Sequence, residues 1–365
     1  MDESEAVADL RRNPLMLALM CIIYRGQNWI PRNRPDMYEH CANLLFDKWD
    51  SSRQIYVELK AKAYVDPAIK HLAWWMFTES GGTQGVTESV LVNETAQFLT
   101  HAFQSQSETQ AAARQFVEFC RGRAWVLTDV GTNADGESLF AFTHRTFLEY
   151  FAAYELTRRH NGPEQVAKTL LPHVSVAEWG IVAELAVQIS NKHSKDGASR
   201  VLKSIISDRR YRSSSSRNNI MRFAYRCLGF THVPVSLAEE IARDFVEAIL
   251  QFGVDTTRLA SERCLIVPEL ASTVESTVVS RLANHIENRQ LKTSDVAIEV
   301  TLELPRILGG TDSLGEDGRW TARRAELFGN HEPEILSKFD EATWISAWRN
   351  GLISLEKLMC EGPRS

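Results

Sequence analysis

The sequence lacks both a long apolar run and a secretion signal. Its longest apolar stretch, residues 14–24, is much shorter than the roughly 20 residues that a transmembrane helix needs, and therefore predicts a buried helix. The N-terminus is acidic and then basic before this stretch begins, which is the wrong order for a signal peptide. We therefore expect a cytoplasmic protein that makes no membrane contact.

Paired cysteines and an excess of positive charge are also missing. The six cysteines are scattered, without a C-x-x-C pair or a histidine at zinc-finger spacing, so we expect reduced, buried thiols and no zinc site. The 41 lysines and arginines are outnumbered by 47 aspartates and glutamates, which gives a net charge of −6. This balance does not favour non-specific binding of nucleic acid by the chain as a whole. The cysteines are Cys21, Cys41, Cys120, Cys227, Cys264 and Cys360.

Catalytic motifs are absent as well. No G-x-x-x-x-G-K-[ST] occurs, and the glycine-rich stretches 81–85 and 309–318 contain no lysine that could reach a phosphate. His331-Glu332 resembles the start of a zinc-binding H-E-x-x-H motif, but Pro333 follows and Ile335 stands where the second histidine would be. We therefore expect no metal site, and this chain is not expected to be an ATPase or another enzyme.

What the sequence does contain is a series of helix signals interrupted once by strand signals. Apolar residues at helical spacing predict helices over residues 14–24, 35–50, 66–79, 87–103 and 109–121. Residues 124–128 and 139–143 have the apolar and β-branched content of a β-hairpin. Thr143 is then expected to cap a helix with an aromatic stripe, which we interpret as core packing. Helices, a hairpin and a helix in this order predict a winged-helix domain.

The second half of the chain has the pattern of short amphipathic helices. They are expected over residues 176–189, 197–206, 218–228, 235–252 and 273–287, with one candidate strand at 297–302 and loops at 211–217 and 309–318. No fixed repeat length is present, so an irregular α-α superhelix is favoured over a regular repeat array. The predicted fold class is mainly α, with a helical subdomain (1–60), a winged-helix domain (61–162) and a HEAT-like helical region (163–365).

Two stretches resemble one known family. The first, residues 13–24 with 31–50, is similar to the helical subdomain that follows the nucleotide-binding core of NACHT-type STAND NTPases. The second, FAFTHRTFLEYFAA at 140–153, resembles the F-x-H-x-x-x-x-E-[YF]-x-A-A signature that ends the winged-helix domain of that family. Their order and separation also match, so the resemblance covers roughly residues 5–160. The Walker A and Walker B motifs of the family's core are not found in this sequence.

The resemblance implies a role in a nucleotide-controlled switch. In the family, the proline at the position of Pro14 packs against adenine, and the histidine at the position of His144 donates a hydrogen bond to the β-phosphate of ADP. ADP or ATP is therefore expected only if a P-loop core is supplied elsewhere. The family also implies a ligand or protein partner on the C-terminal helices, homo-oligomerisation and, for bacterial members, defence against phage. From the residues alone, the favoured interpretation of His144 is a packing residue between Phe142 and Phe147, and that of Pro14 is an ordinary first-turn proline.

Two other functions stay open. A winged helix can bind DNA through the helix before its hairpin, but that helix offers only Arg114 and Arg121 against Glu118, which is a poor phosphate-binding face. The one basic stretch, residues 208–226, holds six arginines and one aspartate, and a solvated loop between exposed helix faces is the favoured interpretation. The other alternative is a helical scaffold or remnant that binds a protein partner without nucleotide.

Overall fold

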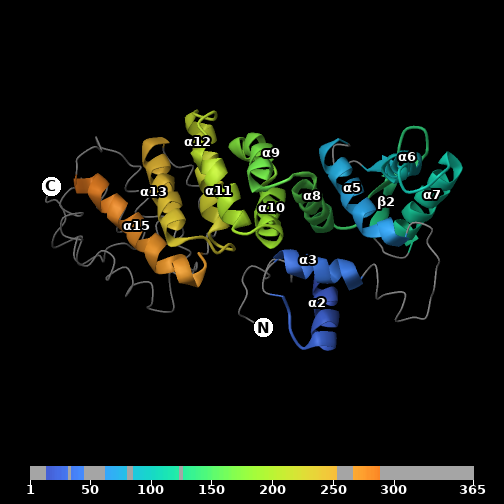
Figure 1. Cartoon of the computed structure of the whole chain (residues 1–365), viewed down its shortest axis with the longest axis horizontal. Coiled ribbons are helices and arrows are strands. Elements are labelled where there is room, and N and C mark those ends of the chain that lie inside the picture. Colours follow the sequence, from blue (N-terminus) through green and yellow to red (C-terminus); the bar gives the residue numbers. More distant parts are fainter. Residues whose placement is uncertain are drawn as a thin grey trace, which may run out of the picture. The chain divides into compact units, whose positions relative to one another are not determined.

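The computed structural model describes residues 14–31, 34–44, 62–79, 85–122, 126–252 and 266–287. In this part of the chain the fold is mainly helical with one small three-stranded antiparallel sheet, which confirms the mainly α class (Figure 1). The described residues group into two compact units. The first holds those up to Leu170 together with Trp179–Val201, and the second holds Leu171–Glu178 and those from Leu202 onward.

A helical hairpin opens the first unit. It consists of α2 (Pro14–Gln27) and α3 (Arg34–Asn43), which pack on each other, whereas the part of the second predicted helix beyond residue 44 lies outside the described residues. α2 ends where Asn28 adopts a left-handed backbone (φ 57°) and donates its N–H to Tyr24 O at 2.7 Å. The inward side chains of α2 are at most 3% exposed; they are Met16, Leu19, Met20 and Ile23.

The outward face of α2 is apolar too. Leu17, Ile22 and Tyr24 are 40%, 42% and 49% exposed, so this helix is hydrophobic on both sides. Cys21 lies on the same face and is exposed, which makes the prediction of a buried thiol wrong at this position. The prediction is confirmed for the described cysteines Cys41, Cys120 and Cys227, while Cys264 and Cys360 lie outside the described residues.

The core of the first unit forms around α8 (Arg145–Arg159). This helix packs against α3, α5 (Val65–Thr78) and α10 (Gly180–His193), and a short 3-10 turn, η3 (Lys62–Tyr64), leads into α5. The predicted aromatic stripe is buried here, because Phe147, Tyr150 and Phe151 are 1–2% exposed. Their rings also contact one another and Tyr38 of α3 at centroid distances of 5.3–6.1 Å.

The small sheet lies between α5 and α8 in the sequence. Its elements and the helices between them are β1 (Val86–Thr87), α6 (Glu88–Leu99), α7 (Gln106–Gly122), β2 (Leu127–Thr132) and β3 (Ser138–Phe142). The strand order is β1-β3-β2 and both pairings are antiparallel, with a bulge between Asp129 and Gly131. The sequence predicts the β2–β3 hairpin but not β1, because two residues are too short for a strand pattern. Thr87, expected inside a helix, is instead the last residue of β1 and the N-cap of α6.

Within the described ranges, six helices follow the sheet and α8. Besides α10 they are α9 (Pro163–Ser175), α11 (Gly197–Ser207), α12 (Ser214–Cys227), α13 (Val235–Phe252) and α15 (Pro268–Glu287). α12 packs on α13 and α13 on α15, and the rings of Tyr225 and Phe245 stack at 4.2 Å within the second unit. No helix in the described ranges is long and apolar enough to cross a membrane.

Two predictions about this helical region need correction, and one helix is not among those predicted. This helix is α9, where Pro163 occupies the first turn and Pro172 is accommodated near the end. α10 begins at Gly180 and not at 176, because Ala177 and Trp179 adopt positive φ angles of 60° and 55° between the helices. The loop expected at 211–217 is shorter, since α12 begins at Ser214. The candidate strand 297–302 and the loop 309–318 lie outside the described residues.

The junction of α10 and α11 generates a first prediction. A Cβ atom on Gly197 would lie 1.9 Å from the carbonyl oxygen of Ser190, which is backbone and does not yield as a flexible side chain would. We expect Gly197→Ala to lower the free energy of unfolding by about 1–3 kcal/mol, as overpacking does. Urea denaturation measures this change.

The matched control is Gly26→Ala in α2. A Cβ there meets nothing within 4 Å, so alanine should leave stability unchanged or raise it by about 0.5–1 kcal/mol through its better helix propensity. Equal stability of the two variants would show that α10 and α11 do not approach each other as closely as the structure has them.

Candidate functional site

His144 lies at the junction of β3 and α8. The N–H of Thr143 donates to Val126 O at 2.8 Å across the hairpin, and the carbonyl of His144 accepts the N–H of Phe147 at 3.0 Å. The N-cap of α8 is therefore His144, with an extended backbone (φ −131°, ψ 124°). The prediction that Thr143 caps this helix is wrong, because its backbone still pairs with the neighbouring strand.

The start of α8 has the chemistry of an anion site. The first N–H groups of any helix have no carbonyl four residues earlier, and the helix dipole favours negative charge there. No acidic residue occupies this first turn, and within the described chain Thr143 Oγ1 is buried without a hydrogen-bond partner. Burial lowers the pKa of the half-buried His144 imidazole, so the neutral ring has one donor and one acceptor nitrogen at neutral pH.

A buried carboxylate lies one turn further along α8. Glu149 is 4% exposed and accepts a hydrogen bond from Arg145 Nε at 2.8 Å. Burial raises the pKa of Glu149 above its ordinary value, although Arg145 and Arg34 of α3 oppose this shift. The Arg145 side chain is 70% exposed, so its charge reaches solvent beside the helix N-terminus. The local charge at the start of α8 is therefore balanced and not strongly positive.

Pro14, the other predicted site residue, is the first residue of α2. Its side chain is outside the described part of the structure, so its distance from His144 is not defined. The two helices are linked through α3, which packs on both α2 and α8. The structure thus places the two residues on elements of one compact unit.

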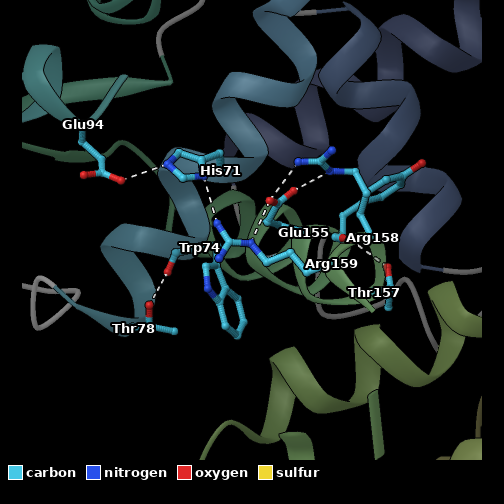
Figure 2. A network of polar contacts seen from close by, with 9 residues as sticks. His71, Trp74, Thr78, Glu94, Glu155, Thr157, Arg158 and Arg159 are labelled. Carbon is cyan, nitrogen blue, oxygen red and sulfur yellow. Dashed lines mark hydrogen bonds and ion pairs between the residues drawn. The ribbon is translucent and has the colours of Figure 1, made fainter. Parts of the chain in front are cut away.

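At the other end of α8 lies a polar network that sequence reasoning missed (Figure 2). Glu155 is 1% exposed and accepts from Arg158 Nε at 2.7 Å and Arg159 Nε at 2.9 Å. Arg159 Nη2 also donates to His71 Nδ1 at 2.9 Å, and His71 Nε2 lies 2.9 Å from Glu94 Oε1. Figure 2 shows His71 of α5 between Glu94 of α6 and Arg159 of α8, so the network joins three helices.

The network has the geometry of a structural contact between helices and not of a proton-transfer site. Arginine has only donors, so His71 Nδ1 accepts and its Nε2–H donates to Glu94. Both ring nitrogens are occupied and the ring stacks on Phe98 at 4.7 Å, which leaves no lone pair for a substrate. No sequence signal predicts these contacts, because His71 and Arg159 are 88 residues apart.

A polar cleft of about 550 Å³ lies between α6, α7 and β3. Arg121 lines it, and its guanidinium lies 4.0 Å from the ring centroid of Phe140 and pairs with Glu88. The remaining charged groups are Arg114 and Glu137, so the cleft carries no net charge to attract an ion. Within the described residues, no group of three or more potential metal ligands is present.

The chain has no match among known proteins in three comparisons. No family model, no curated protein and no solved structure matches it. Function must therefore be argued from the residues and geometry above.

The burial of Glu149 generates a pH prediction. A carboxyl whose pKa is higher in the folded than in the unfolded state binds more protons when folded, so stability falls as pH rises above its ordinary pKa near 4.5. We expect Glu149→Gln to remove this loss. The variant should gain stability relative to the natural protein as the pH rises above about 4.5, measured as the difference in free energy of unfolding.

Glu164→Gln serves as the control with the opposite sign. Hydrogen bonds from Arg200 lower the pKa of this exposed carboxyl, so its ionised form favours the folded state and its contribution is lost on acidification. A stability difference for Glu149→Gln that stays constant with pH would contradict the assignment of a buried, destabilised carboxylate.

Proposed function

We propose that this chain is the regulatory and sensing portion of a nucleotide-controlled switch of the NACHT/STAND type, located in the cytoplasm, with no ATPase activity of its own. The observation that carries the proposal is the position of the F-x-H-x-x-x-x-E-Y signature at the junction of β3 and α8. There the signature's histidine is the N-cap residue and its glutamate is buried one turn later.

The order of elements supports a winged-helix domain within residues 61–162. α5, β1, α6, α7, β2 and β3 follow one another, and the antiparallel pair β2 and β3, with β1 on the other side of β3, would form the wing. Residues 1–60 would then be the helical subdomain, represented by α2 and α3. Residues 163–365 would be a HEAT-like sensor region, represented by α9 to α15, for a protein or other ligand.

The start of α8 supports binding of a nucleotide phosphate when a P-loop core is supplied. The backbone N–H groups of the first turn, the Thr143 hydroxyl and a neutral His144 ring are donors of the kind that suits the β-phosphate of ADP. ADP would hold the closed state by preferring it to the open one, and a ligand on the sensor would shift the population the other way. Homo-oligomers and defence against phage belong to this proposal as features of the family.

The outward face of α2 supports the docking of a partner domain on this helix. A helix that is apolar on both sides is ordinarily buried on both sides, and exposed clusters of large apolar side chains mark interaction surfaces. Leu17 and Tyr24, two turns apart on one side of the outward face, and Ile22 on its other side are such exposed side chains on the helix that begins with Pro14. A P-loop core that docks there would bring adenine within reach of Pro14.

DNA binding through the winged helix is the weaker candidate. On α7, Arg114 is exposed but Glu118 is exposed one turn later, and Arg121 is paired with Glu88. The hairpin adds the exposed carboxylates of Asp129 and Asp135, which repel phosphate. A helical scaffold without nucleotide remains the alternative if no core exists.

The test begins with the coding sequence upstream of Met1 and the size of the natural polypeptide. We expect a G-x-x-x-x-G-K-[ST] core in frame or in an adjacent gene, and retention of ADP by the protein that contains it. His144→Ala should then release ADP about 10–100-fold faster, since one hydrogen bond to a charged group is worth about 1.5–3 kcal/mol.

His101→Ala is the matched control, because this exposed histidine follows α6 and lies outside the proposed site. ADP release from it should be unchanged. Absence of any P-loop core would overturn the switch proposal, whereas an ADP-bound protein that His144→Ala leaves unaltered would remove only His144 from it.

A further inference from the structure

A basic loop joins α11 to α12 in the second unit. Some of its arginines form ion pairs with carboxylates of the described fold, and others do not. Arg210 Nε donates to both oxygens of Asp208 at 3.0 and 3.1 Å. Arg217 donates to Ile206 O at 2.7 Å and to Asp244 Oδ2 at 3.1 Å. These two arginines are thus occupied by partners within the fold.

Three other cations of this segment remain available. Lys203, Arg209 and Arg212 are exposed, and no carboxylate in the described ranges forms an ion pair with them. Residues 203–217 contain five cations and one carboxylate, in a chain whose net charge is −6. The positive charge is therefore concentrated locally against the overall balance.

The loop is held in one conformation by its own hydrogen bonds. Asp208 Oδ1 accepts the backbone N–H of Arg210 at 2.8 Å, and Arg212 Nε donates to Arg209 O at 2.7 Å. Ser213 then caps α12 by accepting the N–H of Ser216 at 3.2 Å. Arg209 and Arg212 consequently belong to the same turn, and ordering them on a partner costs less than ordering a free loop.

We propose that Lys203, Arg209 and Arg212 form a contact surface for the phosphodiester backbone of a nucleic acid, bound without sequence readout. The guanidinium groups match phosphate oxygens with paired N–H donors, and the exposed hydroxyls of Ser214 and Ser215 add further donors. This surface goes beyond the proposed switch function and does not depend on it.

One observation favours a nucleic acid over an acidic protein, and a second favours contact with the backbone over contact with the bases. A protein interface has an apolar centre, but none of the large apolar side chains exposed in the described ranges falls within residues 203–217. The one aromatic residue of the loop, Tyr211, is half-buried with Arg210 5.9 Å above its ring, so it is no open platform for stacking bases. The surface is therefore suited to contact the phosphodiester backbone of a nucleic acid and not its bases.

The experiment is a fluorescence-anisotropy titration of a labelled duplex of about 20 base pairs with the full chain at several salt concentrations. Three phosphate contacts predict a slope of about −2.7 in log K against log salt. The double variant Arg209→Ala with Arg212→Ala should reduce the slope to about −0.9 and weaken binding at least about tenfold at about 50 mM salt. Its circular dichroism should be unchanged, because both side chains are exposed.

Arg114→Ala is the matched control. It removes an equally exposed arginine from α7, where a DNA-reading winged helix would make its contacts, and should leave affinity and slope unaltered. Poly-glutamate at equal charge concentration should displace the duplex poorly. Salt-independent binding, no binding at about 50 mM salt, a loss in Arg114→Ala as large as in the double variant, or displacement by poly-glutamate would each overturn the proposal.

Discussion

The fold of the first unit depends on the burial of α8. Helices α3, α5 and α10 and strand β3 all pack against it, and its apolar side chains form the centre of the core. Phe147 and Phe151 are 2% and 1% exposed, and burying a side chain of this size contributes about 1.5–3 kcal/mol. A change that displaces α8 would therefore loosen four neighbours together.

The polar groups at the two ends of α8 follow from the same constraint. A helix covered on several sides must satisfy its charged side chains within the fold, because an unpaired buried charge is costly. At the C-terminal end, Glu155 accepts from Arg158 and Arg159, whose positive charges also suit the negative end of the helix dipole. At the N-terminal end the helix dipole favours an anion, and His144, with the hydroxyl of Thr143, lies where one would bind. The proposed nucleotide contact thus lies at the end of α8 whose helix dipole favours an anion.

How far the sequence predicts this arrangement depends on how local each signal is. The aromatic residues of α8 recur at helical spacing, and the β2–β3 hairpin has two short runs of strand-forming residues around a turn. Both are local patterns, and both predictions are confirmed. β1 has too few residues to show the alternating pattern of a strand, and Pro172 interrupts the helical pattern near the end of α9. The contact of His71 with Arg159 joins residues far apart in the chain, so only the folded structure reveals it. For the site, the sequence indicates His144 through a motif. Only the folded structure shows that the buried hydroxyl of Thr143 has no hydrogen-bond partner, and which arginines of the loop after α11 have partners within the fold.

Hydrogen exchange followed by mass spectrometry on the full chain tests the central role of α8 most directly. If the other elements depend on it, the amides of α8 and α5 exchange slowest in the first unit and only through global unfolding, while those of α6 and α7 exchange through smaller openings. Exchange of α8 that is faster than that of α6 and α7 would contradict the account, because a helix that opens alone cannot be the element on which its neighbours depend.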